Sequence, residues 1–355
     1  MAGSARMCGL DALRGIAVFL MIEQHVGVWL WQGIARGRPL GSAWPLVAFN
    51  ALGGGAAPMF ITLAGVGTAL LARARREGVD AVLVRRGLVL LGLGYLLSWM
   101  TPSWFSWGSW FVLHLMGFAM ATAPLWRRLG DRALLGTAIV VAIAAIAVQG
   151  WLDMPFQVDN PYMRNTGRPG GALRLALAES QFPILPWLAP FLVGMVAGRW
   201  IAERRFRAIA TMGAVSLAIG AIGLGIGLSW SEPEWVHRAF AVHLGFFPAS
   251  ITIVALLLGL VLLVIAAVSA WDERAPLSER NPMVVLGRAS LTLLLVHVPL
   301  FREATRPLHY WQALPAGVVL LVIAAFLLLS TVLARQWQRV GYRGGAEWLL
   351  RRLGG

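Results

Sequence analysis

The stretch LDALRGIAVFLMIEQHVGVWLWQG, residues 10–33, decides the fold class of this chain. At about 1.5 Å of rise per residue, a helix of this length crosses the hydrocarbon core of a bilayer. The same stretch carries four ionisable side chains, Asp11, Arg14, Glu23 and His25. A cleavable signal peptide would not carry such a set in its apolar region. We therefore expect the stretch to be retained as the first of several membrane-spanning helices.

Apolar runs of similar length follow along the rest of the chain. Hydrophobic residues make up 58% of the sequence and charged residues only 13%, which is more apolar surface than a soluble core of this size can bury. We expect an all-α, polytopic membrane protein of about ten helices. The expected spans lie near residues 10–33, 47–72, 82–100, 108–125, 133–151, 182–200, 208–228, 248–269, 284–302 and 314–334.

The net charge of +14 comes from arginines that cluster in alternate connections between these spans. The positive-inside rule places such connections, and with them both termini, in the cytoplasm, so the charge requires no nucleic-acid partner. We expect residues 1–335 to form one domain in the plasma or inner membrane and residues 336–355 to form a basic cytoplasmic tail. Cys8 is the one cysteine, which excludes an intramolecular disulfide.

Arg14 and His25 are predicted to share one face of the first helix. Eleven positions at about 100° each amount to three turns plus roughly 20°, and the two residues lie about 16 Å apart along the axis. Asp11 lies one turn from Arg14 and is expected to pair with it. Either this stripe lines a functional groove, or Asp11 and Arg14 anchor the helix end while His25 hydrogen-bonds a neighbouring helix.

Two further histidines, His114 and His297, lie in the outer halves of their predicted spans. Three imidazoles at similar depth indicate a shared polar cavity, and histidine is the side chain best suited to accept a proton near neutral pH. A structural hydrogen bond is the alternative role for His114 and His297. No second ligand lies three or four positions from any of the three, so we predict no metal site.

Tryptophan is concentrated near the predicted outer ends of the spans, as at Trp29 and Trp110. An aromatic belt at the membrane interface accounts for this pattern. Stacking on a sugar ring is the functional alternative.

Five motifs resemble those of the transmembrane acyltransferases, which include acyltransferase family 3 and the heparan-alpha-glucosaminide N-acetyltransferase catalytic domain group. The opening motif also reproduces the family's arginine, ten residues, histidine pattern through Arg14 and His25. Each motif alone is weak, but five in the right order along most of the chain are specific. They are LDALRGIA at 10–17, APMFITLAGV at 57–66, VLHLMG at 112–117, FPILPW at 182–187, and LGRASL at 286–291 continuing to HVP at 297–299.

The resemblance implies transfer of an acyl group, most simply acetyl, from cytoplasmic acyl-CoA to a hydroxyl or amine of an extracytoplasmic carbohydrate or lipid-linked glycan. His25 matches the family's essential histidine and is predicted to be a base or a transient acyl carrier. We group the other predicted site residues by role. Asp11 and His114 would assist catalysis, Arg14, Arg85, Arg86 and Arg288 would bind acyl-CoA, and Trp29, Trp110, Trp187 and His297 would bind the acceptor.

Two other classes of function stay open at this point. In a proton-coupled transporter, Asp11, Arg14, Glu23 and His25 would form a proton relay. An inverted repeat would support that class, and none is evident. In a non-catalytic envelope scaffold, the polar groups would only fix helix packing, with or without homo-oligomerisation.

Overall fold

The computed structural model describes residues 7–37, 54–75, 77–156, 170–230, 232–242 and 247–355. The chain divides into two compact units, which are described separately. The first unit comprises Met1–Phe60 and Trp271–Arg352, so the two ends of the sequence fold together. The second comprises Ile61–Ala270 and Leu353–Gly355.

The first unit is built around the N-terminal helix and the helices near the C-terminus. It also holds the start of α4 and the end of α13, two helices that continue into the second unit. Its helices are α1 (Cys8–Leu30), α2 (Gln32–Ala35), α14 (Pro282–Arg288), α15 (Ser290–Arg302), α16 (Ala316–Gln338) and α17 (Ala346–Gly354).

The second unit contains the middle of the chain. The full bounds of the two shared helices are Ala56–Ala74 for α4 and Ile251–Arg274 for α13. The remaining elements are α5 (Val79–Met100), α6 (Val112–Ala121), α7 (Ala123–Trp126), α8 (Asp131–Trp151), α9 (Gly171–Arg174), the π-helical turn η2 (Leu175–Glu179), α10 (Ile184–Ala202), α11 (Phe206–Ser229) and α12 (Glu234–Phe240).

Eight helices in the described part of the chain are long and apolar enough to cross a membrane. The pair α14 and α15, bent by 79°, is apolar and long enough to form a ninth, broken span or a re-entrant loop. The fourth expected span, near residues 108–125, is divided between the short helices α6 and α7. These findings confirm the predicted all-α, polytopic class, while the cytoplasmic placement of the termini stays a prediction.

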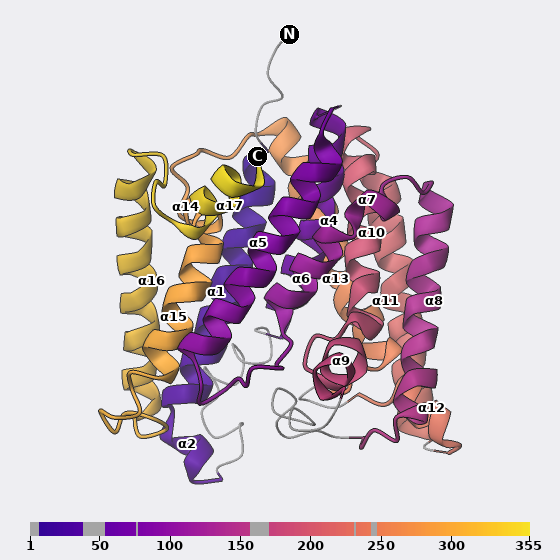
Figure 1. The fold of residues 1–355 in the computed structure, drawn as a ribbon, viewed down its shortest axis with the longest axis horizontal. Coiled ribbons are helices and arrows are strands. Elements are labelled where there is room, and N and C mark those ends of the chain that lie inside the picture. Colours follow the sequence, from indigo (N-terminus) through magenta and orange to yellow (C-terminus); the bar gives the residue numbers. More distant parts are fainter. Residues whose placement is uncertain (1–6, 38–53, 76, 157–169, 231, 243–246) are drawn as a thin grey trace. The chain divides into compact units, whose positions relative to one another are not determined.

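Helix α1 packs against α14, α15 and α16 in the first unit (Figure 1). The closest approach is between α1 and α14, where Gly15 faces the backbone of Met283 and Gly287 faces the backbone of Asp11. A Cβ atom at either glycine would overlap with the opposing carbonyl oxygen. Small residues allow the backbones of two membrane helices to approach this closely, so the two glycines determine where α1 and α14 pack together.

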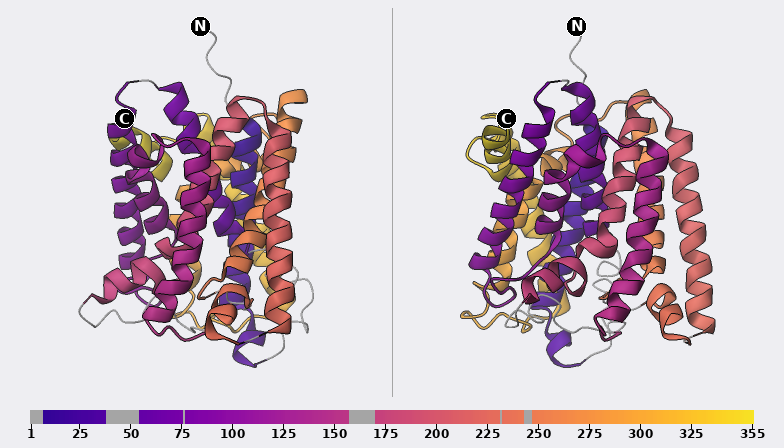
Figure 2. Two further views of the ribbon diagram at one scale, coloured as in Figure 1. Left: turned by 90° about the vertical axis from the view of Figure 1, so that its right-hand side faces the viewer. Right: turned by 45° about the vertical axis from the view of Figure 1, so that its right-hand side comes forward.

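In the second unit, α5 packs on α6, and α8 packs on α10 (Figure 2). Helix α4 reaches α10 through Gly65 and Gly194, whose missing side chains leave room for the carbonyl groups of Phe191 and Thr62. At the predicted cytoplasmic end, Arg199 of α10 donates a 2.8 Å hydrogen bond to the carboxylate of Asp131. That ion pair joins α10 to the first turn of α8.

Candidate active site

His25 of α1 and His297 of α15 are in direct contact, whereas their similar depth had predicted a polar cavity shared with His114. Nδ1 of His25 lies 2.9 Å from Nε2 of His297, and the ring centroids are 5.2 Å apart at an interplanar angle of 15°. His297 is fully buried, whereas His25 is partly exposed. Two helices far apart in sequence thus deliver two imidazoles to one point inside the first unit.

The backbone sets the hydrogen positions of this histidine pair. Nδ1 of His297 lies 2.8 Å from the carbonyl oxygen of Leu293, which can only accept, so this nitrogen carries the hydrogen. In a neutral ring Nε2 of His297 is then the acceptor, and Nδ1 of His25 must donate to it. In this tautomer the lone pair of the neutral His25 ring is on Nε2. This assignment follows from the hydrogen-bond network and gives His25 the tautomer that a general base needs.

Trp29 holds the other side of the His25 ring. Their rings are stacked with centroids 4.7 Å apart, and Trp29 is 3% exposed. The Trp29 carbonyl accepts a 2.8 Å hydrogen bond from the backbone N–H of Gln312, and the guanidinium of Arg302 lies 5.6 Å from the Trp29 ring centroid. The same guanidinium lies 4.9 Å from the ring centroid of Trp311. Stacking and backbone pairing therefore hold His25 in one orientation.

At the predicted cytoplasmic end of α1, Asp11 binds two arginines. One carboxylate oxygen accepts from Arg14 at 2.8 Å, as the sequence predicted, and the other accepts from Arg288 at 3.0 Å. Arg288 also donates to Glu279 at 3.1 Å. Asp11 and Arg288 are buried, whereas the Arg14 side chain is 32% exposed. We call these four residues the inner ion-pair network.

The other predicted histidine, His114, belongs to the second unit. It is fully buried, and its Nδ1 accepts a 3.3 Å hydrogen bond from the backbone N–H of Phe111. Its neutral ring therefore carries the hydrogen on Nε2, which has no hydrogen-bond partner among the described residues. Trp110 stacks on this ring at a centroid distance of 5.6 Å, and Tyr95 meets it edge-on at 4.4 Å. In this tautomer Nε2 of His114 can donate a hydrogen bond but cannot accept a proton.

The remaining predicted residues differ in accessibility. Trp187 is fully buried and lies edge-on to Phe182 at 5.2 Å. Arg85 is exposed on α5, while Arg86 donates a 3.2 Å hydrogen bond to the backbone oxygen of Gly355. Of these residues, Arg85 presents the side chain most open to a ligand.

Several groups around the histidine pair and the inner ion-pair network were not predicted from the sequence. The Leu293 carbonyl leaves no side-chain signal, whereas Glu279 and Arg302 are charged residues near the two ends of the bent α14–α15 pair and were detectable on that ground.

Glu23 is 2% exposed, and no described residue hydrogen-bonds its carboxylate oxygens. In the described part of the chain, no three histidine, cysteine or acidic side chains lie close enough together to hold a metal ion.

Comparison with known proteins agrees with the motifs. A search of curated proteins gives no significant match. The family model described as heparan-alpha-glucosaminide N-acetyltransferase, catalytic, matches residues 6–226, a region that contains Asp11, Arg14, His25 and His114. Because this region is more than half of the chain, the protein belongs to the heparan-alpha-glucosaminide N-acetyltransferase catalytic domain family.

Proposed function

We propose that this membrane protein transfers an acetyl group from acetyl-CoA to a hydroxyl or amine of a carbohydrate, with Nε2 of His25 as the general base. Family membership implies acetyltransferase activity with acetyl-CoA as donor in a multi-pass membrane protein. The observation that carries the assignment to His25 is the hydrogen-bonded series from the Leu293 carbonyl through His297 to His25. In this series His25 donates to His297, and His297 donates to the Leu293 carbonyl. This order supports a lone pair on Nε2 of His25.

The proposed reaction begins when Nε2 of His25 takes the proton of the acceptor O–H or N–H group. The acceptor oxygen or nitrogen then attacks the thioester carbonyl carbon, and the carbon–sulfur bond breaks. The proton held on His25 passes to the departing CoA thiolate, which regenerates the neutral ring. During this cycle the imidazolium of His25 keeps its Nδ1 hydrogen bond to His297. An acetyl-histidine intermediate on His25 is the two-step alternative.

For donor binding, the structure favours Arg14 over Arg288. Arg14 is partly exposed and pairs with Asp11 through one N–H group, so its remaining N–H groups can reach a phosphate. Arg288 is buried and bonds to two carboxylates, which balance its charge. We propose that Asp11 and Arg288 orient Arg14 and tie α1 to α14. Asp11 lies 14 residues from His25, about 21 Å along the helix, so it acts on the donor end.

The acceptor is proposed to be an amino sugar or a related hydroxyl-bearing sugar on the outer side, in line with the glucosaminide named by the family. The three tryptophans predicted to bind it have their rings packed against His25, His114 and Phe182. Sugar stacking on any of them requires one of these ring contacts to open. Trp29 is the one of the three that touches the proposed base.

The test is release of free thiol from acetyl-CoA by the purified full chain, with glucosamine or glucose as acceptor. We expect His25→Ala and His25→Gln each to lower turnover by about 100-fold or more, because both remove the base. His309→Asn, at an exposed histidine in the same unit, is the matched control and should keep full activity. Full activity of His25→Gln would refute the assignment. A product with glucosamine but not glucose would identify N-transfer.

A further inference from the structure

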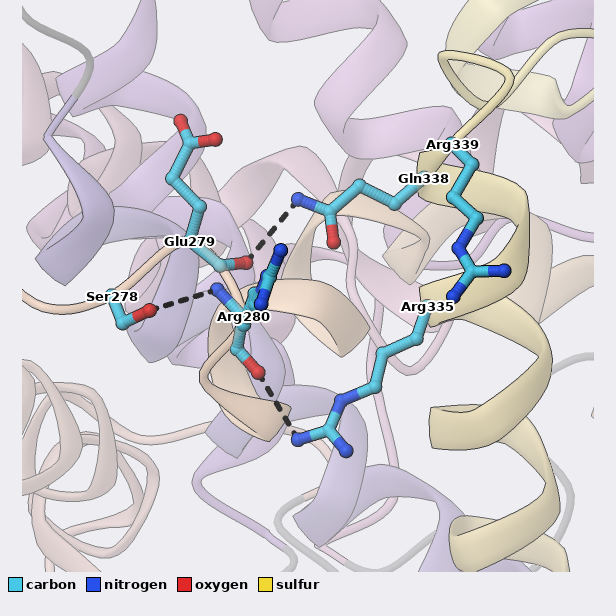
Figure 3. A pocket seen from close by; sticks show the side chains of 6 residues that line it. All are labelled: Ser278, Glu279, Arg280, Arg335, Gln338 and Arg339. Atoms are coloured by element: carbon cyan, nitrogen blue, oxygen red, sulfur yellow. Dashed lines mark hydrogen bonds between the residues drawn. The ribbon is translucent and has the colours of Figure 1, made fainter.

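A pocket in the first unit lies where α16 ends and the chain enters α14. It has a volume of about 900 Å³ and is open to solvent. Its lining residues are Ser278, Glu279, Arg280, Arg335, Gln338 and Arg339 (Figure 3). Arg335 and Arg339 lie one turn apart at the end of α16, and Arg280 faces them from the segment before α14. We call this the arginine pocket.

The three guanidinium groups of the arginine pocket have no anionic partner. None of them forms an ion pair with any described residue, and Arg335 donates instead to the backbone carbonyl of Arg280 at 3.1 Å. The one carboxylate in the lining, that of Glu279, bonds to Arg288 at 3.1 Å. Figure 3 shows this carboxylate turned away from the arginines. The pocket therefore carries three positive charges that the protein leaves unbalanced.

The pocket walls are held by backbone hydrogen bonds rather than by charge pairing. Gln338 donates to the carbonyl of Glu279 at 3.3 Å, and the N–H of Arg280 donates to the Ser278 hydroxyl at 3.2 Å. The bonds from Gln338 and Arg335 attach the segment before α14 to α16, and the bond to Ser278 closes a turn within that segment. Like charges held this close repel one another, and an anion bound between them would remove that cost.

We propose that the arginine pocket binds the phosphate group of an organic phosphoester. Arginine forks match phosphate oxygens in bidentate geometry, and three forks around one space can bind a dianion. The volume lies within the range of pockets that enclose small molecules, so the ligand is larger than a bare ion. The ligand is either a soluble phosphoester of nucleotide type or the headgroup of an anionic phospholipid.

The three arginines of this pocket have no part in the proposed catalytic chemistry, although Glu279 of its lining also bonds to Arg288 of the inner ion-pair network. The pocket's residues lie outside the matched region 6–226, and none of them belongs to the histidine pair. The positive-inside rule explains why arginines occur at this end of α16, but it does not require three of them to converge on one pocket without a carboxylate. The proposal holds whether or not the chain transfers acetyl groups.

Binding is measured on the purified full chain in nanodiscs of phosphatidylcholine. CoA, which carries a phosphomonoester, is titrated by calorimetry as the soluble probe in the Arg14→Gln background, which removes the proposed donor site, with inorganic phosphate for comparison. Retention of phosphatidylglycerol, measured by native mass spectrometry, tests the lipid source. The variants are Arg335→Gln and the triple change of Arg280, Arg335 and Arg339 to Gln, and the control is Arg207→Gln, an exposed arginine of the second unit.

We expect Arg335→Gln to weaken one of the two ligands about tenfold, the triple variant to weaken it further, and Arg207→Gln to have no effect. Loss of CoA binding alone identifies a soluble phosphoester, and loss of phosphatidylglycerol alone identifies a lipid headgroup. Binding that persists in the Arg14→Gln background belongs to the pocket and not to the proposed donor site, which separates this proposal from the catalytic one. Wild-type binding of both ligands by the triple variant, or an equal loss in Arg207→Gln, overturns the proposal. Unchanged melting of the variants excludes misfolding as the cause.

Discussion

Replacing His297 tests whether the histidine pair fixes the tautomer of His25. In His297→Leu the acceptor for the His25 Nδ1–H is lost, although the side chain remains of similar size. In His297→Gln the side-chain carbonyl can take over as acceptor, and its NH₂ group can bond to the Leu293 carbonyl. The two variants therefore differ in whether the series of hydrogen bonds from Leu293 to His25 can be rebuilt.

The expected magnitude follows from this contact. Nδ1 of His25 and Nε2 of His297 are 2.9 Å apart, and His297 is fully buried. Leaving a buried donor without an acceptor costs about 1–3 kcal/mol, and the ring escapes part of that cost by moving its hydrogen to Nε2. That tautomer has no lone pair facing the acceptor substrate. Since about 1.4 kcal/mol corresponds to a factor of ten, turnover should fall about 10- to 100-fold in His297→Leu.

The assay is steady-state thiol release with acetyl-CoA and an amino sugar varied in turn. We expect His297→Leu to lower kcat while the KM for acetyl-CoA stays within about twofold, because the donor's phosphates bind elsewhere. His297→Gln should keep turnover within about threefold of wild type. Nitrogen NMR of labelled histidine would report the tautomer of His25 directly. If His297 served packing alone, its replacement would leave that tautomer unchanged.

A kcat of His297→Leu equal to that of the unchanged protein would refute the proposed role of His297. That role also fails if His297→Gln is as slow as His297→Leu while both melt normally, since the glutamine restores the acceptor. In either case the contact would serve packing, and the base assignment for His25 would lose its support from the structure.

Three further predictions concern helix contacts and a buried carboxyl. Gly287→Val should destabilise the protein by about 3 kcal/mol or prevent folding, because its side chain would overlap with the backbone of Asp11; size-exclusion and melting profiles test this. Glu347→Gln should lower stability by about 1 kcal/mol, because this carboxylate accepts hydrogen bonds from the N–H groups of Leu291 and Thr292 at the start of α15; an unchanged melting temperature would contradict it. Glu23→Gln should keep acetyl transfer within about threefold, because His25 and not Glu23 is the proposed base; loss of transfer with normal folding would favour a proton relay through Glu23 instead.

The sequence predicted the fold class and the helix positions because apolar length is a local property. Each of the ten expected spans overlaps a helix, a bent pair or a divided helix, although residues 47–53 of the second span lie outside the described part of the chain. The bend between α14 and α15 was not predicted. No proline stands at Ala289, and the break depends on contacts with α1 and the C-terminal segment, including the cap from Glu347. Such contacts join residues that are distant in sequence, so no local pattern records them.

In the candidate site, the relations within one helix could be predicted from the sequence, whereas the contacts between helices could not. Helical periodicity placed Arg14 and His25 on one face and paired Arg14 with Asp11, because these relations lie within one helix. The pairing of His25 with His297 was indicated only by similar depth, and its geometry depends on how α1 meets α15. The contacts of Arg288 with Asp11 and Glu279 depend on the close approach of α1 to α14.

The bent span explains how one straight helix can serve both ends of the proposed reaction. Helix α1 meets α14 where Asp11 binds Arg288, and it meets α15 at the histidine pair, about 21 Å further along its axis. Arg14 lies about 16 Å from His25 along the same axis. A donor whose phosphates bind at Arg14 can react at His25 only if a thin arm of that length separates its phosphates from its acyl carbon. Acyl-CoA has such an arm, whereas a compact donor such as an acyl phosphate does not. With Arg14 and His25 in their proposed roles, the distance between them fits the long arm of an acyl-CoA donor.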